Sequence, residues 1–181
     1  MMKKILSLLL CAAVLLVFAA ASAGDMTAVN FRDRFQIQGT LPDGYKCSIL
    51  SQTDMTLEAE IASDDPAAPV MTLYVSFSEI YADVKRLNDL SAVDLERIKQ
   101  GFSAEYDVTF DEAETSLGTK LLVVREVGSD QDFLDFYTIY RGHDIELLMS
   151  AGEGAPDRTL TDRQAAMCID FLSKMDIVPV E

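Results

Sequence analysis

The stretch from Thr115 to Ala151 constrains the fold most, because few structures other than strands suit its side chains. Three runs rich in β-branched, leucine or aromatic residues follow one another, and Gly- and Asp-containing turns separate them. Such runs, punctuated in this way, are typical of hairpins. The runs are apolar on both faces, so the sheet they form should be covered on both sides. The predicted strands are Leu121–Val127, Phe133–Tyr140 and Ile145–Met149, with turns at Gly128–Asp130 and Arg141–Asp144.

An antiparallel meander is predicted before this stretch. Met55, Leu57, Ala59 and Ile61 alternate with polar residues, which is the pattern of a half-buried strand. The remaining strands of the meander are expected at Phe35–Gln38, Tyr45–Ile49 and Val70–Phe77. The polar segment Asp25–Arg34 is expected to be a loose lead-in, and Asp176–Glu181 a tail or one more edge strand.

Two amphipathic helices are predicted, one in mid-chain and one near the end. Ser91 is the expected N-cap of the first, with Asp94 as a partial capping box and an apolar stripe that includes Leu95, Ile98, Phe102 and Tyr106. Thr161 and Gln164 form a fuller capping box for the second, whose stripe is Ala165, Cys168, Ile169, Leu172 and Met175. Glu79–Leu87 is expected to be a short helix or an ordered loop. Together these elements predict an α+β fold, specifically a three-layer α/β/α sandwich with a largely antiparallel central sheet.

The first 23 residues have the pattern of a secretory signal peptide. Two lysines at Lys3–Lys4 precede the apolar run Ile5–Ala20, and Ala21–Ser22–Ala23 is a small-residue cleavage site. An uncleaved membrane anchor is the alternative, but the run is shorter than the roughly 20 residues of a spanning helix. We therefore expect residues 24–181 to be one exported domain, periplasmic or extracellular, without membrane insertion after cleavage.

The net charge of the chain limits which classes of binding partner are expected. The whole chain has a net charge of −15, which becomes −17 when Lys3 and Lys4 are removed. Nucleic acids and anionic membrane surfaces are both bound through Lys and Arg, so neither is expected as a partner. Cationic partners and loosely held divalent cations are compatible with this charge, as is a simple role in keeping a secreted protein solvated.

Cys47 and Cys168 lie on predicted core faces and leave two alternatives. A disulfide between them would close a long loop, and the chain-entropy model gives such a loop about 4–5 kcal/mol of stabilisation. Two separate buried thiols would also fit, because free cysteine is often a small core residue. No C-x-x-C motif is present, so a redox role is not expected.

The other residues that could act in catalysis or metal binding match no known site motif. His143, the single histidine, stands beside Asp144 in a predicted turn, but no G-x-S-x-G motif supplies a nucleophile. Polar turn chemistry is therefore the expectation for His143, and a zinc site is not expected. The sequence thus predicts no catalytic residue, no cofactor site and no metal site.

The acidic and aromatic groups have ordinary explanations as well. Asp64–Asp65 and Asp130–Gln131–Asp132 lack the offsets of an EF-hand, and Glu58 with Glu60 reads as a solvated strand face. The aromatic residues of the central strands are expected in the core, with a ligand pocket as the alternative. These residues are Phe133, Phe136, Tyr137 and Tyr140.

The order of elements resembles the PsbP-like (Mog/PsbP-like) domains. The resemblance rests on the Leu41–Pro42–Asp43–Gly44–Tyr45 turn, the mid-chain helix, the hairpin with its Gly142 turn, and the helix Thr161–Met175. That family includes photosystem-associated subunits, a Ran-binding protein and many exported bacterial proteins, and its members mostly act in binding or assembly. No functional motif of the family is matched, so the resemblance implies a fold and a class of role, and no site residues.

These observations favour an exported, non-enzymatic protein that binds or helps to assemble another envelope or secreted protein. A module that binds a small molecule or a divalent cation is the second hypothesis. A hydrolase with an unrecognised site is the third.

Overall fold

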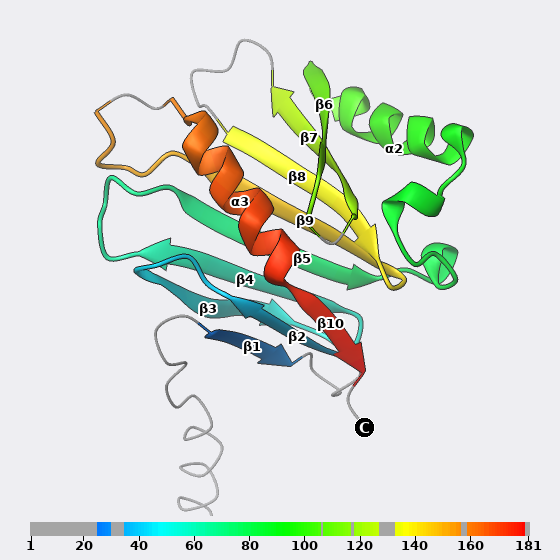
Figure 1. Cartoon of the computed structure of the whole chain (residues 1–181), viewed down its shortest axis with the longest axis horizontal. Coiled ribbons are helices and arrows are strands. Elements are labelled where there is room, and N and C mark those ends of the chain that lie inside the picture. Colours follow the sequence, from blue (N-terminus) through cyan, green and yellow to red (C-terminus); the bar gives the residue numbers. More distant parts are fainter. Residues whose placement is uncertain are drawn as a thin grey trace, which may run out of the picture.

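The computed structural model (Figure 1) describes residues 25–29, 35–105, 107–116, 118–126, 133–156 and 159–179. Within these residues the chain forms a seven-stranded sheet, a three-stranded sheet and two α-helices. Every pair of neighbouring strands is antiparallel. The predicted α+β class with a largely antiparallel sheet is therefore confirmed.

The large sheet joins two meanders edge to edge. Its strand order is β3-β4-β5-β9-β8-β7-β6, so the pairing of β5 with β9 connects the first meander to the second. Bulky β-branched, leucine and aromatic side chains fill these strands, which suits a pleated, half-buried surface. The strands are β3 (Tyr45–Gln52), β4 (Thr56–Ser63), β5 (Val70–Phe77), β6 (Val108–Glu114), β7 (Lys120–Glu126), β8 (Phe133–Tyr140) and β9 (His143–Ser150).

The three consecutive strands predicted around the centre of the sequence are confirmed as β7, β8 and β9. Arg141 and Gly142 form the two-residue turn between β8 and β9, with φ values of 51° and 76°. Left-handed conformations at both positions are what a type I′ hairpin turn requires. The other predicted turn, Gly128–Asp130, lies outside the described residues.

A second, smaller sheet was not predicted. It consists of β1 (Asp25–Val29), β2 (Phe35–Thr40) and β10 (Asp176–Pro179), in the order β1-β2-β10. The assignment of Phe35–Gln38 to the first meander was therefore wrong, and so was the loose lead-in, part of which is β1. The physical reason is a contact between distant parts of the chain: β10 follows the last helix directly and pairs with β2. Ile37 of β2 and Ile177 of β10 are both buried in the hydrophobic core. The expectation of an edge strand in the tail is confirmed.

The two helices are α2 (Ala92–Glu105) and α3 (Asp162–Lys174), and both begin where their capping residues predict. The Ser91 hydroxyl accepts a hydrogen bond from the Asp94 amide at 3.2 Å. Thr161 and Gln164 form the complete capping box of α3, each backbone amide donating to the other residue's side chain. Two 3₁₀ turns, η1 (Glu79–Tyr81) and η2 (Leu87–Asp89), precede α2 in the segment expected to be a short helix or ordered loop.

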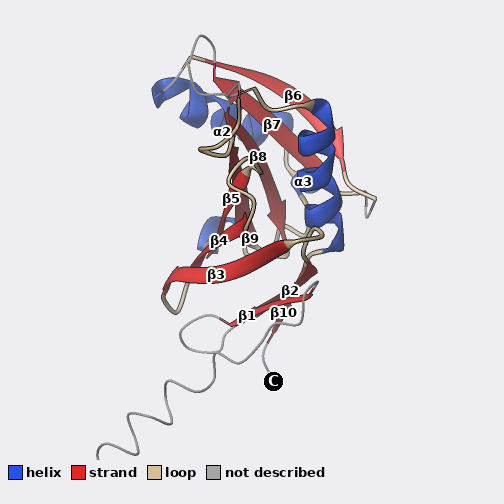
Figure 2. Cartoon of the chain, turned by 90° about the vertical axis from the view of Figure 1, so that its left-hand side faces the viewer, coloured by secondary structure: helices blue, strands red, loops and turns tan. Residues whose placement is uncertain are grey.

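The helices pack on opposite faces of the large sheet, as Figure 2 shows. Alternate residues of β7–β9 point to each helix: Leu121, Phe136 and Leu147 belong to the cluster with α3, whereas Leu122 and Tyr137 belong to the cluster with α2. The two faces of the same strands are therefore buried by different helices.

Among the described residues, neither helix has the length and apolar character that crossing a membrane would require. The predicted signal peptide, residues 1–23, lies outside the described part of the chain and stays a prediction.

Candidate ligand-binding cleft

A cleft of about 520 Å³ lies between α2 and the sheet face that this helix partly covers. Its volume is within the range of small-molecule sites, which are typically about 300–1,000 Å³. Most of its lining is apolar or aromatic, and two carboxyl groups lie in it. The lining residues are Ile98, Gly101 and Phe102 of α2, Val108 of β6, Val124 of β7, Phe133 and Asp135 of β8, and Glu146 and Leu148 of β9.

Strand pairing brings the two carboxyl groups together. Side chains alternate along a strand, so Asp135 and Tyr137 of β8 share the face that α2 covers. The register of β8 and β9 places Glu146 opposite Tyr137 and Leu148 opposite Asp135. Asp135 and Glu146 are consequently diagonal neighbours on two adjacent central strands.

Asp135 is the most unusual residue of the cleft. It is 5% exposed, and its Oδ1 is the one buried side-chain oxygen or nitrogen of the described residues without a hydrogen-bond partner. Burial, the charge of Glu146 and a hydrogen bond with the Glu146 side chain raise the pKa of Asp135 to about 9. At neutral pH the Asp135–Glu146 pair therefore holds one proton in a shared hydrogen bond. A buried oxygen left without a partner costs about 1–3 kcal/mol, so it requires an explanation.

A second polar pair lies beside the first. The Tyr137 hydroxyl donates a short hydrogen bond to Asp144 of β9. Burial and then this hydrogen bond raise the pKa of Tyr137, and burial raises the pKa of Asp144 as well. The Tyr137 ring packs edge-on against Phe102 at a centroid distance of 5.6 Å, which links this pair to α2. Hence the floor under α2 carries acidic and phenolic groups in a row.

The nearby cations are paired with other carboxylates. Lys99 of α2 lies 3.6 Å from Glu112 of β6, and Arg97 lies 3.1 Å from Asp94. Arg125 of β7 lies 3.6 Å from Asp111. In the described part of the chain, no Lys, Arg or His side chain forms an ion pair with Asp135 or Glu146.

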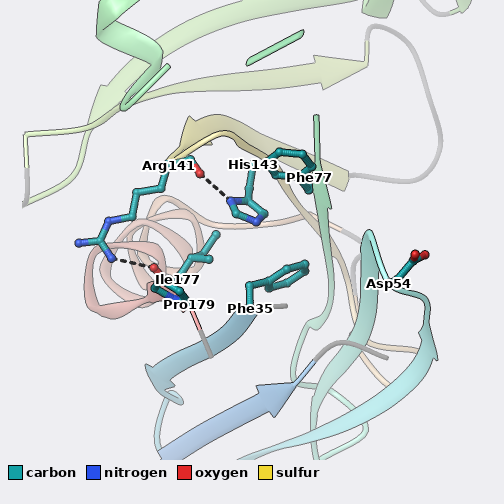
Figure 3. Close-up of a pocket in the computed structure, with 7 residues that line it drawn as sticks. All are labelled: Phe35, Asp54, Phe77, Arg141, His143, Ile177 and Pro179. Atoms are coloured by element: carbon teal, nitrogen blue, oxygen red, sulfur yellow. Dashed lines mark hydrogen bonds between the residues drawn. The ribbon is translucent and has the colours of Figure 1, made fainter. Parts of the chain in front are cut away.

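His143 occupies a separate, smaller pocket of about 220 Å³, shown in Figure 3. Its ring lies between Phe35 and Phe77, with centroid distances of 4.7 and 5.5 Å, and its Nδ1 is 2.8 Å from the Arg141 carbonyl oxygen. It begins β9 and is 8% exposed, and burial lowers its pKa. The expected polar contact within the turn is present, but the burial of the ring was not predicted, because β2 of the small sheet brings Phe35 over the hairpin end.

Arg141 holds the small sheet to this pocket. Its guanidinium donates to the Ile177 carbonyl oxygen at 2.7 Å and lies 3.0 Å from the Asp176 carboxylate. The single histidine is thus packed between aromatic rings at the junction of the two sheets. This packing is that of a structural residue, and among the described lining residues no Ser, Thr, Cys or Lys accompanies His143.

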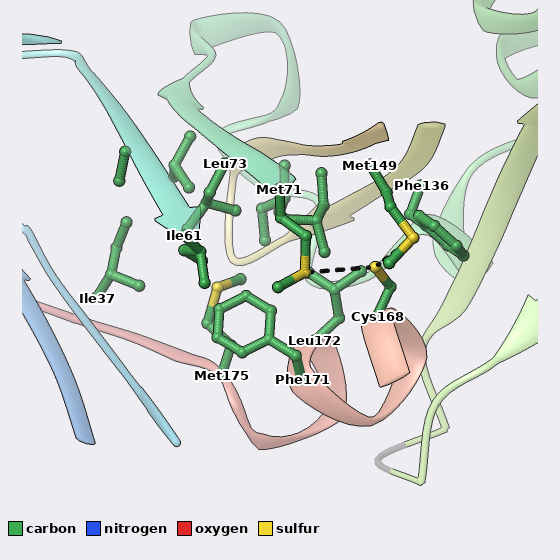
Figure 4. Close-up of a cluster of buried hydrophobic side chains, with 14 of the residues drawn as sticks. Ile37, Ile61, Met71, Leu73, Phe136, Met149, Cys168, Phe171, Leu172 and Met175 are labelled. Carbon is green, nitrogen blue, oxygen red and sulfur yellow. Dashed lines mark hydrogen bonds between the residues drawn. The ribbon is translucent and has the colours of Figure 1, made fainter. Parts of the chain in front are cut away.

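Cys47 and Cys168 are free thiols in the structure, and no bond joins them. Figure 4 shows Cys168 within the core beneath α3, where its Sγ lies 3.6 Å from the Met71 sulfur and 4.0 Å from that of Met149. Burial raises the pKa of both thiols, so both are less reactive than an exposed cysteine. Of the two predicted alternatives, the disulfide is absent from this structure.

The other predicted carboxylate groups have local partners. Asp64 pairs with Lys46 at 2.6 Å, and the Asp65 carboxylate accepts from the Ala67 amide. Glu58 and Glu60 lie half-buried on β4, whereas Asp130–Gln131–Asp132 lies outside the described residues. Within the described ranges, no group of three or more His, Cys, Asp or Glu side chains is placed to hold a metal ion.

The sequence interpretation missed Asp135 and Glu146. Of the predicted aromatic group, Phe133 lines the cleft and Tyr137 lies next to it, whereas Phe136 is in the α3 core and Tyr140 packs against that core. One available signal was an aspartate in the middle of a strand that is apolar on both faces. A charged residue at such a position is almost never fully buried unless it is paired, so it marks a special environment.

Comparison with known proteins adds a distant similarity of structure. The solution structure of cyanobacterial PsbP (CyanoP) from Synechocystis sp. PCC 6803 is similar to this chain with a TM-score of 0.47 and 16% sequence identity. The similarity covers 88% of this chain and 96% of that one. No protein-family model matches the chain. No curated protein matches it either.

Proposed function

We propose that this chain is an exported, non-enzymatic binding domain of the three-layer, PsbP-like type, and that the cleft under α2 holds its ligand. The observation that carries this proposal is Asp135, a buried carboxyl group with an unpartnered oxygen in an apolar cleft. A polar group in that state lowers the stability of the free protein, and a bound ligand that supplies its partner would recover the loss.

Binding accounts for the cleft better than catalysis does. The described lining residues include no Ser, Thr, Cys, His or Lys that could act as a nucleophile. A hydrogen-bonded carboxyl pair is also too close for glycoside hydrolysis, which needs the two carboxyl groups about 5–9.5 Å apart. The lining also has no side-chain amide and no Lys, Arg or His beside the two carboxyl groups. The hydrolase hypothesis therefore ranks last.

Protein binding remains the second form of this function. Beside the cleft, Tyr74 of β5 is 39% exposed, and partial burial followed by the nearby charges of Glu58 and Glu146 raises its pKa. An exposed aromatic ring among carboxylates suits a partner surface with basic side chains. In this form, a side chain of an envelope or secreted protein would enter the cleft.

The first test is a ligand screen by thermal shift on three proteins. Gly101 lines the cleft, and a Cβ added there meets nothing within 4 Å, so Gly101→Leu should place a side chain in the cleft mouth without a backbone clash. Ser103→Leu puts the same side chain on an exposed position of the same helix that does not line the cleft, and is the matched control. A true ligand should stabilise the wild type and Ser103→Leu but not Gly101→Leu.

The result that overturns the cleft is stabilisation of all three proteins by the same compounds, or of none. In-cell crosslinking of the same three proteins separates the two forms of the function, since a protein partner that uses the cleft should be lost with Gly101→Leu alone. Export is tested independently by the N-terminal sequence of the cell-derived protein, which should begin at Gly24.

A further inference from the structure

We propose that the cleft binds an organic cation, an ammonium group on an apolar stem, with the cation seated between Asp135 and Glu146. This inference rests on the proposed binding function and names the chemical class of its ligand.

The geometry supplies one part of the argument. Two adjacent carboxyl groups lie at one place in the cleft, and Asp135 has an oxygen that no described group satisfies. The remaining walls are apolar side chains, with Phe102 and Phe133 as aromatic rings. Carboxylates and aromatic faces both attract cations, and apolar walls favour a hydrocarbon stem. Few other ligands use all of these surfaces.

The charges around Asp135 supply the second part. From β9 it faces Glu146, and from β7 it faces Val124, with Glu126 two residues further along the same strand. From α2 and β6 the cleft receives the apolar Ile98, Phe102 and Val108. Lys99 of α2 is not among the lining residues and pairs with Glu112. The described surroundings are therefore acidic or apolar, and a cation is the partner that they lack. An anionic ligand would meet repulsion from Glu146.

A metal ion fits this cleft less well than an organic cation. Calcium takes six to eight oxygen ligands. The described lining offers two side-chain carboxyl groups, and its other seven residues have no side-chain oxygen. A cavity of about 520 Å³ also leaves far more room than one ion needs. An alkylammonium group would use both the carboxyl groups and the volume.

Binding should be coupled to a proton. At neutral pH the Asp135–Glu146 pair holds one proton, so a ligand ammonium that replaces this proton leaves two carboxylates, and one proton passes to the solvent. The ligand keeps its own charge, and the one covalent bond that breaks is the carboxyl O–H of this pair. Affinity should therefore rise with pH until the pair loses this proton in the free protein, by up to about tenfold for each pH unit.

The test is isothermal titration calorimetry with n-hexylammonium chloride, and with n-hexanol and sodium hexanoate as neutral and anionic probes of the same length. Hexylammonium should bind at least about tenfold more tightly than either, which corresponds to one charged hydrogen bond. Titrations in two buffers of different ionisation enthalpy should show release of close to one proton. Asp135→Asn should weaken binding about tenfold or more and remove the proton release.

Two further variants keep the result interpretable. Glu146→Gln should weaken binding of hexylammonium, whereas Glu60→Gln, which removes a carboxylate of β4 outside the cleft, should leave its affinity within about twofold. Each variant is first checked for a cooperative thermal transition, so that loss of binding is not confused with loss of fold.

Each outcome decides something. Hexanol or hexanoate binding as tightly as hexylammonium, in a manner blocked by Gly101→Leu, would overturn the cation while leaving the binding function in place. Failure of hexylammonium to bind the wild type would also overturn it, and the separate ligand screen would then judge the binding function. Full affinity of Asp135→Asn for hexylammonium would remove Asp135 from the site.

Discussion

The two faces of the large sheet are built from the same strands but meet very different requirements. Under α3 the buried side chains are almost all apolar, and Cys168, Met71 and Met149 bring their sulfur atoms together there (Figure 4). Under α2 the alternate residues of β8 and β9 include Asp135, Tyr137, Asp144 and Glu146, and the apolar residues of the helix that face them are only half-buried.

This difference indicates a division of labour between the faces. The α3 face also receives Phe35 and Ile37 of β2 and Ile177 of β10, so it unites both sheets in one core. The α2 face has a carboxyl group whose burial lowers stability, which is a common property of functional sites. We therefore expect the α3 face to determine folding stability and the α2 face to determine binding.

The largest effect on folding stability should come from replacing one phenylalanine of each helix with alanine. Phe171 of α3 is 1% exposed, and Phe171→Ala should lower the free energy of unfolding by about 3–5 kcal/mol. Phe102 of α2 is only half-buried, so Phe102→Ala should cost about 1–2 kcal/mol. Urea unfolding of both variants measures these two losses in the free energy of unfolding. Equal losses would contradict the division between the faces.

The next effect has the opposite sign. Asp135→Leu removes a buried carboxyl group from apolar surroundings and should raise the free energy of unfolding by about 1–3 kcal/mol at pH 7. The folded-state pKa of Asp135 is raised from 3.8 to about 9. The stability linked to its proton is therefore fully present below about pH 4 and is lost as the pH rises towards 9.

The gain from Asp135→Leu should consequently be small at pH 4 and grow between pH 4 and pH 9. Chemical denaturation of both proteins across this range measures it. Glu60→Gln, in which a half-buried strand carboxylate outside the cleft loses its charge, is the control and should show no comparable trend. A wild-type protein that gains stability relative to Asp135→Leu at alkaline pH would mean that Asp135 is ionised and paired.

Much of this architecture follows from local sequence patterns, because the relevant forces are local. The capping residues Ser91 and Thr161 mark the helix starts, and Gly142 marks the central hairpin. In contrast, the second sheet depends on pairing between β2 and β10, which are far apart in the sequence. No periodicity within Phe35–Thr40 distinguishes a partner in β3 from a partner in β10.

The candidate site was harder to predict for the same reason. The burial of Asp135 depends on α2 lying over β8, and its raised pKa depends on Glu146 of β9. Neither relation can be read from the neighbours of Asp135 in the chain. The sequence could show only that an aspartate stands in an aromatic strand. Likewise His143 has the sequence context of a turn, and its burial depends on Phe35, which the small sheet supplies.

A smaller effect should come from the two helix caps. Thr161→Ala removes the hydroxyl that accepts from the Gln164 amide in a complete capping box, and should cost about 1 kcal/mol. Ser91→Ala removes the corresponding cap of α2 and should cost about 0.5–1 kcal/mol. Thermal unfolding measures both, and hydrogen exchange of the helix amides locates the effect. A larger global loss from Ser91→Ala would reverse the ranking of the two faces.

The smallest effect concerns Gly101, and it joins stability to the cleft. Glycine in a helix interior costs about 0.5–1 kcal/mol relative to alanine. A Cβ at position 101 meets nothing within 4 Å, so Gly101→Ala should stabilise the protein by about that amount. Because position 101 lines the cleft, the wild-type glycine keeps the mouth of the cleft open at a small cost in helix stability. Thermal unfolding of Gly101→Ala, with Ser103→Ala as the control on the same helix, measures the gain. Destabilisation by Gly101→Ala would mean that α2 packs more tightly there than the cleft requires.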